Sequence, residues 1–324
     1  MSLDGFDPRW TDFPDYIIGI TKEIWEDRGI SRLHEYYSRD ILVRAPAGIV
    51  VGNENVIGAT MMTLAEFPDR ALLGEDVIWS DDGTGRYLSS HRLFSTATHS
   101  NDGVYGKATG TRLQYRIMAD CAAKGNVIDD EWIIRDQGAI VRQLGIDPKT
   151  YAADEIARQG GADTASRPFT PAVDKQGPYT GRGNEHAIGA RYADLLQRIM
   201  GAEMSVIPTH YDRACHLELP GGVTRHGYAA ADEFWMNLRS AFPSATFEVH
   251  HVIGRDDPEM PPRAALRWSL TGKHEGFGAF GPPSHADVHV MGISHAEFGP
   301  WGLRREYVAI DETAIWKQIL LGAG

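Results

Sequence analysis

The sequence has little cysteine and a shortage of basic residues. Cys121 and Cys215 are its only cysteines in 324 residues, so a disulfide framework is not expected. There are 32 Lys and Arg residues against 44 Asp and Glu, the formal net charge is −12, and the basic residues form no cluster. Nucleic acids and anionic membrane surfaces are bound through clustered positive charge, so we expect neither as a partner.

Long apolar runs and the usual catalytic signatures are also lacking. No stretch approaches the roughly 20 apolar residues of a membrane-spanning helix. The first ten residues, MSLDGFDPRW, resemble no signal peptide, so a cytoplasmic location is the default expectation. We find no glycine-rich phosphate loop, no Gly-x-Ser-x-Gly turn and no Cys–His pair. Nucleotide cofactors and covalent catalysis are therefore not expected.

What the sequence does contain is an internal repeat. A shift of 175 residues aligns the two halves without a gap, and the aligned pairs include Tyr36 with Tyr211, Arg92 with Arg267, His99 with His274, and Asp136 with Asp311. The repeat predicts one domain over residues 12–149 and a second over 185–324. Residues 150–184, rich in Gly, Pro, Ala and Ser, are expected to be a linker, one that could pack on a domain surface.

Each copy shows helical patterns followed by strand patterns. In the first copy the patterns predict helices over 15–25, 31–38, 53–67 and 137–144, and strands over 73–80, 86–99, 109–121 and 126–136. Helices that precede an antiparallel meander indicate an α+β fold, in which a curved sheet wraps onto the helices.

The second copy carries motifs that resemble those of the SnoaL-like polyketide cyclases, a family of the nuclear transport factor 2-like superfamily. They are LRWSLTGKHEGFGAFGPPS at 266–284, Gly-Ile-Ser at 292–294 and GLRREYVAID at 302–311. The resemblance implies two tandem cone-shaped (cystatin-like) domains, each with about three N-terminal helices on a curved antiparallel sheet around a mostly apolar pocket. It also implies cofactor-free acid–base chemistry on a small apolar molecule.

The family's own catalytic positions are altered in this chain. The resemblance places an active-site His at Ser294 and an acid–base Asp at Val308, or at Ala119 and Ile133 in the first copy. A one-residue bulge would bring Asp120 or His295 into the first of these positions. We therefore expect a small-molecule enzyme of cyclase, isomerase or hydrolase type acting on an apolar oxygenated ligand, or, as the alternative, a non-catalytic ligand-binding or scaffold protein of the same fold.

Two repeated pairs are the candidate catalytic residues. His274 lies on the apolar face of its strand, and His99 occupies the same place in a strand whose inward set, which includes Ser89, His91 and Ser95, is polar enough to mark a pocket. The alternative is a His that only fixes a turn. Asp136 and Asp311 could be pocket carboxylates or could cap the helix that follows each of them.

Other polar residues are given a structural interpretation. Glu131 and Glu306 alternate with the face of Asp136 and Asp311, so we expect them to be solvated. A zinc site on one face of the strand 285–289 is conceivable, but the polar non-ligands at the matching places of the first copy favour a solvated face. No metal site is expected.

Aromatic residues recur where the pocket should be. Most should be core residues, and the candidate ligand-binding residues are Trp132, Tyr307, Trp268, His91, Tyr36, Tyr211 and Trp235. Because single-copy relatives commonly pair through their sheets, the two domains are predicted to form an internal pseudo-dimer, and a homo-oligomer would also be compatible with the sequence.

Overall fold

The computed structural model describes residues 3–322, which form two domains built around six-stranded sheets. The strand order is β2-β1-β6-β5-β4-β3 in the first sheet and β8-β7-β12-β11-β10-β9 in the second. The second order is the first one repeated. The α+β fold is thus two tandem copies of one unit, as the sequence predicts.

The first domain places its longer helices before or between the strands. Its elements are α1 (Phe13–Thr21), α2 (Leu33–Tyr36), β1 (Tyr37–Ala45), β2 (Gly48–Val51), α3 (Asn53–Glu66), β3 (Ala71–Asp81), β4 (Arg86–Thr98), β5 (Arg112–Lys124), β6 (Val127–Arg135) and α4 (Gln137–Gln143). A π-helical turn, Lys22–Glu26, extends α1, and the Asp12 side chain caps its start by accepting the Asp15 amide at 2.8 Å.

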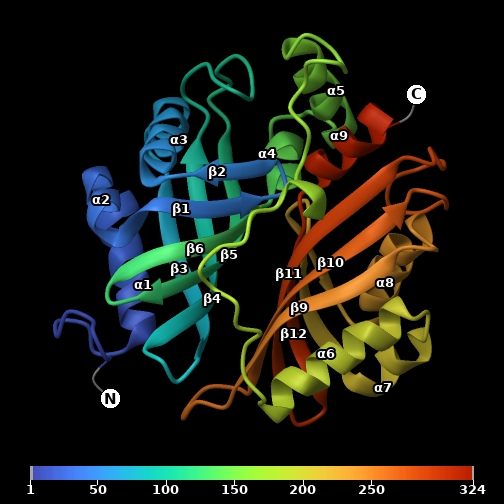
Figure 1. The fold of residues 1–324 in the computed structure, drawn as a ribbon. Coiled ribbons are helices and arrows are strands. Elements are labelled where there is room, and N and C mark those ends of the chain that lie inside the picture. The colour runs from blue at the N-terminus through green and yellow to red at the C-terminus, as the bar shows by residue number, and fades with distance from the viewer. Residues whose placement is uncertain (1–2, 323–324) are drawn as a thin grey trace.

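The second domain repeats these elements nearly residue for residue. They are α6 (Ala187–Met200), α7 (Ile207–His210), β7 (Tyr211–Leu219), β8 (Val223–His226), α8 (Tyr228–Ala241), β9 (Thr246–Arg255), β10 (Arg263–Lys273), β11 (Asp287–Gly299), β12 (Gly302–Ala309) and α9 (Glu312–Gly322). Helix α5 (Pro148–Arg158) lies between the two domains in the sequence and packs against α9 (Figure 1).

Each sheet is mixed, which adds one feature to the predicted antiparallel meander. β3 to β6 and β9 to β12 pair antiparallel in order, but β1 pairs with β6, and β7 with β12, in parallel. The sequence patterns did not reveal β1 and β2. The register of β1 against β6 shifts between Tyr37 and Leu42, and this irregularity breaks the period-two pattern by which a strand is recognised.

The repeat is not free of gaps in this strand. Tyr37 lies opposite Ile128, and Tyr211 lies opposite Leu303, which is the counterpart of Ile128. The structural partner of Tyr211 is therefore Tyr37 and not Tyr36. The β7–β8 turn is one residue longer than the β1–β2 turn and restores the shift of 175 for all later elements.

The two sheets pack face to face with the helices on the outside (Figure 1). A single apolar cluster joins them, with members from both sheets such as Met118, Ile134, Ile253 and Ile293. This is the predicted internal pseudo-dimer. One face of each sheet meets the other domain and the opposite face meets its own helices, so the central strands are buried on both sides.

A buried ion pair crosses the interface. The Arg267 guanidinium of the second domain donates from Nε to Oδ2 of Asp120 at 3.0 Å, and its Cζ lies 3.7 Å from the centre of the Trp132 ring. Both charged groups are buried. Buried charges of this kind persist only when they are paired.

The pseudo-symmetric position holds a related but different contact. The Arg92 guanidinium lies 3.5 Å from the centre of the Tyr307 ring and donates to Nδ1 of His295 at 3.2 Å. Because arginine only donates, Nδ1 accepts and Nε2 carries the proton, which it gives to the Ser90 hydroxyl at 2.8 Å. Burial, with the charge of Arg92, holds the pKa of His295 well below its usual range.

The segment between the domains is fixed by polar contacts on both of them. Buried Arg44 binds Asp130 and donates from Nε to Asp174 at 2.5 Å. The hydroxyl of Tyr179 lies 2.7 Å from Nε2 of His251. Among residues 3–322 no helix combines the length and the apolar character that a membrane crossing requires.

Candidate functional site

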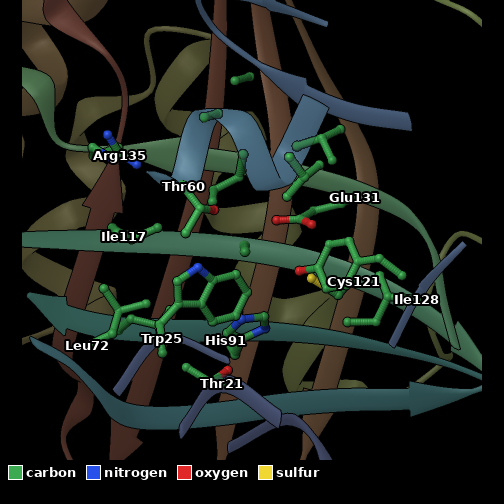
Figure 2. Close-up of a pocket in the computed structure, with 18 of the residues that line it drawn as sticks. Thr21, Trp25, Thr60, Leu72, His91, Ile117, Cys121, Ile128, Glu131 and Arg135 are labelled. Carbon is green, nitrogen blue, oxygen red and sulfur yellow. The ribbon is translucent and has the colours of Figure 1, made fainter. Parts of the chain in front are cut away.

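The first domain encloses a cavity of about 250 Å³ between its helices and the inner face of its sheet. The walls are mostly apolar and come from α1, α3 and strands β1 to β6; they include Ile17, Ile20, Val56, Leu72, Leu93 and Ile117. Trp25, on the π-helical turn, projects into the cavity opposite the sheet (Figure 2). The cavity is the hollow interior of the cone.

Strands β4, β5 and β6 position the polar groups of the cavity in two rows. Glu131 pairs across the sheet with Cys121, which pairs with Ser89. His91 is two residues further along β4 and pairs with Ala119. Side chains two residues apart on a strand share a face, so His91 and Glu131 both point into the cavity (Figure 2).

Glu131 is a buried carboxyl group, and the expectation that it would be solvated is wrong. Its side chain is only 5% exposed. Burial raises the pKa of Glu131 to about 7, although the neighbouring Tyr37 hydroxyl offsets part of the rise. Alternation along β6 fails as a guide because one face of the strand meets the second domain while the other meets the cavity. Glu306 is fully buried for the same reason.

His91 is neutral at physiological pH. Burial lowers its pKa to about 4, and Nδ1 lies 3.1 Å from the Ser89 hydroxyl. A neutral imidazole offers one hydrogen-bond donor and one acceptor. The cavity thus combines a carboxyl group that titrates near neutral pH with an uncharged imidazole, surrounded by apolar walls.

Two tryptophans fill the part of the second domain's interior that lies around Glu306, while a hollow of about 210 Å³ remains beside Phe234, Phe280 and Ile310. Trp235 on α8 takes the place of Thr60 on α3, and Trp268 on β10 takes the place of Leu93. Both indoles are fully buried. Gly292 makes room for the second one, because a Cβ there would lie 2.2 Å from the Trp268 ring. Trp268 donates its Nε1 proton to the Ser294 hydroxyl at 2.8 Å.

Glu306, the counterpart of Glu131, is enclosed by donors in this filled core. Tyr192 donates to it at 2.8 Å and Tyr211 at 2.9 Å, and the Trp235 ring nitrogen lies 3.4 Å away. Burial raises the pKa of Glu306 to about 7 as well. Its donors are all protein side chains, so this carboxyl group acts as a core residue.

The two interiors differ systematically in polarity. The cavity residues Thr60, Thr63, Arg70, His91, Cys121 and Arg135 correspond, at a shift of 175, to Trp235, Leu238, Ala245, Leu266, Ala296 and Ile310. These polar cavity residues are replaced by apolar ones in the second domain, whereas Glu131 and Tyr37 are matched by Glu306 and Tyr211. The first domain therefore holds the candidate site.

The structure places the candidate histidines outside this cavity. Nδ1 of His99 lies 3.1 Å from the Thr109 hydroxyl, and its Nε2 lies 3.2 Å from Glu66. His274 makes the equivalent contact with the Ser284 hydroxyl, also at 3.1 Å. Each ring is buried in the loop that follows its strand and packs on a phenylalanine.

The two aspartates lie at helix starts. Asp136 accepts the Ala139 amide of α4 at 2.9 Å, and it also accepts the amides of Gly221 and Gly222 from the second domain. Asp311 accepts the Thr313 amide at 2.9 Å at the start of α9. Burial raises the pKa of Asp136 to about 6 and that of Asp311 to about 7.

Among the candidate ligand-binding residues, the cavity contains only His91. Trp132 and Tyr307 lie between the two sheets, and the Tyr36 hydroxyl donates to Glu23 at 2.6 Å near the surface. The remaining three, Trp268, Trp235 and Tyr211, belong to the filled core of the second domain.

Several cavity residues were not predicted as site residues, above all Glu131, Arg70 and Arg135. A signal for them was present in the repeat, since positions that are polar in one copy and apolar in the other mark a difference between the two interiors. Within residues 3–322, no three His, Cys, Asp or Glu side chains gather as a metal site would require.

Part of the second domain is similar to a known family of domains. Residues 190–303 match the family model of the SnoaL-like domain. IdmH from Streptomyces antibioticus is 22% identical over 41% of this chain and 98% of its own, with a TM-score of 0.36. A SnoaL-like polyketide cyclase from Agrobacterium tumefaciens is 20% identical over 41% of this chain and 97% of its own, with a TM-score of 0.33. No protein with a curated description matches the chain.

Proposed function

With a SnoaL-like domain in its second half as the premise, we propose that the chain is a small-molecule enzyme whose working site is the cavity of the first domain. In this proposal Glu131 moves a proton to and from an apolar, oxygenated ligand, and no cofactor takes part. The observation that carries the proposal is a buried carboxyl group with a pKa of about 7, facing a cavity. A carboxyl group tuned to neutral pH suits general acid–base catalysis.

The proposed step is proton abstraction next to a carbonyl group. The ionised Glu131 carboxylate takes the proton from carbon, and the electron pair of that bond moves to the carbonyl oxygen to form an enolate. In this proposal His91 takes the tautomer whose Nδ1 accepts the proton of the Ser89 hydroxyl, 3.1 Å away, and whose Nε2 donates to that oxygen. Return of the proton to another carbon would isomerise the ligand, and attack of the enolate on a second carbonyl would close a ring.

Hydrogen exchange tests this step without knowledge of the natural substrate. We would incubate 2-tetralone, an apolar bicyclic ketone, with the protein in deuterated buffer and follow deuterium uptake beside the carbonyl by NMR. Wild type should accelerate uptake above the buffer rate. Glu131→Gln should lower the acceleration by about 10²- to 10⁴-fold, because it removes the base.

The repeat provides a matched control. Glu306→Gln makes the same substitution in the filled domain and should leave exchange unchanged, and His274→Ala should do the same. Thr60→Trp, which copies Trp235, should fill the cavity and abolish exchange in a protein that stays folded by circular dichroism. Equal exchange in wild type and Glu131→Gln would refute the proposed role of Glu131.

A binding protein without catalysis is the alternative function. It is favoured by Ala119 and Ile133, which line the cavity at the two positions where the family resemblance implies catalytic His and Asp residues. Tight binding of ketones by wild type, lost in Thr60→Trp, with no exchange in either protein, would support this alternative.

A further inference from the structure

Two arginines line the same cavity as Glu131. Arg70, just before β3, is only 7% exposed, and Arg135 ends β6. Within residues 3–322 neither guanidinium has a carboxylate within 4.0 Å. Arg70 donates from Nε to the Tyr115 hydroxyl at 3.1 Å. A buried guanidinium such as that of Arg70 is costly unless an anion balances it, and the partly buried Arg135 adds a second positive charge at the same cavity.

The polar neighbours of the two arginines are the tyrosine hydroxyls of Tyr105 and Tyr115. Burial raises the pKa of Tyr105, whereas the charges of Arg70 and Arg135 outweigh burial and lower that of Tyr115. Asp311 is the carboxyl group whose charge raises the pKa of Arg135. It lies beyond ion-pair distance and accepts amide protons at the start of α9. The end of the cavity near the arginines is therefore electropositive.

The second domain has lost this polar cluster completely. In the first domain the cluster consists of Arg70, Tyr105, Tyr115 and Arg135. The equivalent residues of the second domain are Ala245, Phe280, Val290 and Ile310. Because the fold of the second domain is intact with apolar residues at all four places, the arginines are not required to form the cone. The arginines line the cavity of the first domain, whereas the hollow in the second domain has the apolar side chains of Phe280 and Ile310 at the equivalent places.

We propose that Arg70 and Arg135 bind an anionic group of the ligand, a carboxylate, at the end of the cavity opposite Glu131. This rests on the proposed function and specifies its substrate class as an apolar carboxylic acid that carries a carbonyl group. Arg135 and Glu131 are four residues apart on β6, or about 13 Å along the strand. Figure 2 shows the two side chains well apart among the residues that line the cavity. The ligand therefore places its carboxylate and its reacting carbon roughly 10 Å apart.

The probe for this anchor is 6-acetyl-2-naphthoate, compared with the uncharged 6-acetyl-2-naphthamide. Both carry an apolar body and a ketone at the far end, and they differ in the anionic group. Calorimetry should show the carboxylate binding at least about tenfold more tightly than the amide in wild type, since charge-assisted hydrogen bonds are the stronger kind. Arg135→Met and Arg70→Met should each reduce this preference, with little effect on the amide.

Arg112→Met, an exposed arginine of β5, is the matched control and should keep the preference. Arg70→Met should also raise the midpoint of chemical denaturation, because it removes a buried charge that has no carboxylate beside it. A purely structural arginine would lower it.

The result that overturns the anchor is equal binding of the two probes in wild type, or a preference that survives both Arg→Met substitutions. This outcome is separable from the proposed function, which is read from 2-tetralone exchange. Exchange without a carboxylate preference refutes the anchor alone, while a carboxylate preference without exchange supports the anchor and refutes the catalytic role of Glu131.

Discussion

At the scale of residues, the two glutamates show how one position can hold a reactive group or a structural one. Glu131 and Glu306 stand at the same place on equivalent strands, and burial raises the pKa of each to about 7. Glu306 is surrounded by tyrosine and tryptophan donors, whereas Glu131 faces a cavity. The difference lies in the neighbours.

The pH dependence of exchange follows from the pKa of Glu131. Only the ionised carboxylate accepts a proton, so the rate of 2-tetralone exchange should rise with pH and level off above a midpoint near 7. Tyr37 and Asp130 are the charged or phenolic neighbours that set this midpoint besides burial. A rate that follows an ordinary glutamate, with a midpoint near 4.5, would contradict a role for this buried group.

Glu306 should make the protein less stable as pH rises. Its pKa is about 7 in the folded protein against an ordinary value of 4.5. Between these values the folded chain keeps a proton that the unfolded chain releases, so the free energy of unfolding falls as pH increases. Glutamine does not titrate, so the Glu306→Gln variant does not lose stability in this way as pH increases.

The free energy of unfolding of Glu306→Gln, measured relative to wild type, should therefore increase between about pH 5 and pH 8, by on the order of 2–3 kcal/mol. Urea denaturation at several pH values measures it. A difference that does not change with pH would mean that Glu306 titrates normally.

At the scale of elements, the strands β3 to β6 and the helices α1 to α4 could be predicted from the sequence because their periodicity is regular. β1 could not, since its register shift hides the alternation. The candidate site was harder to predict than the strands and helices. Alternation says which residues share a face, but it cannot say that both faces of β6 are buried, and so Glu131 was taken for a solvated residue.

The aspartates that precede α4 and α9 belong to this scale too. Asp136 caps α4 and also accepts two amides of the β7–β8 turn, so it joins the two domains. Asp136→Ala should lower the free energy of unfolding by about 2–3 kcal/mol, as the loss of a cap and of buried hydrogen bonds.

Asp147 offers a comparison, because it caps the neighbouring helix α5 without any contact to the β7–β8 turn. Asp147→Ala should cost only about 1 kcal/mol. Thermal or urea denaturation of the two variants decides the matter, and equal losses would show that the contact to the second domain contributes nothing.

At the scale of the whole molecule, the sheet-to-sheet interface contains the buried Asp120–Arg267 pair. Asp120→Asn should lower the free energy of unfolding by about 3–5 kcal/mol, because Arg267 is left buried without a counter-charge. The double variant Asp120→Asn with Arg267→Met should recover much of the loss, and a urea titration of the three proteins measures it. No recovery in the double variant would mean that packing, and not the unpaired charge, causes the loss.

The filled core of the second domain has an evolutionary consequence. In a homodimer encoded by one gene, every substitution occurs twice, so a tryptophan that closes one interior closes both. Fusion of the two copies into one chain removes this constraint, and Trp235 could appear while Thr60 remained. One half can then exchange internal space for rigidity while the other keeps its polar cavity. The half that matches the SnoaL-like family model is the half whose interior carries the two tryptophans.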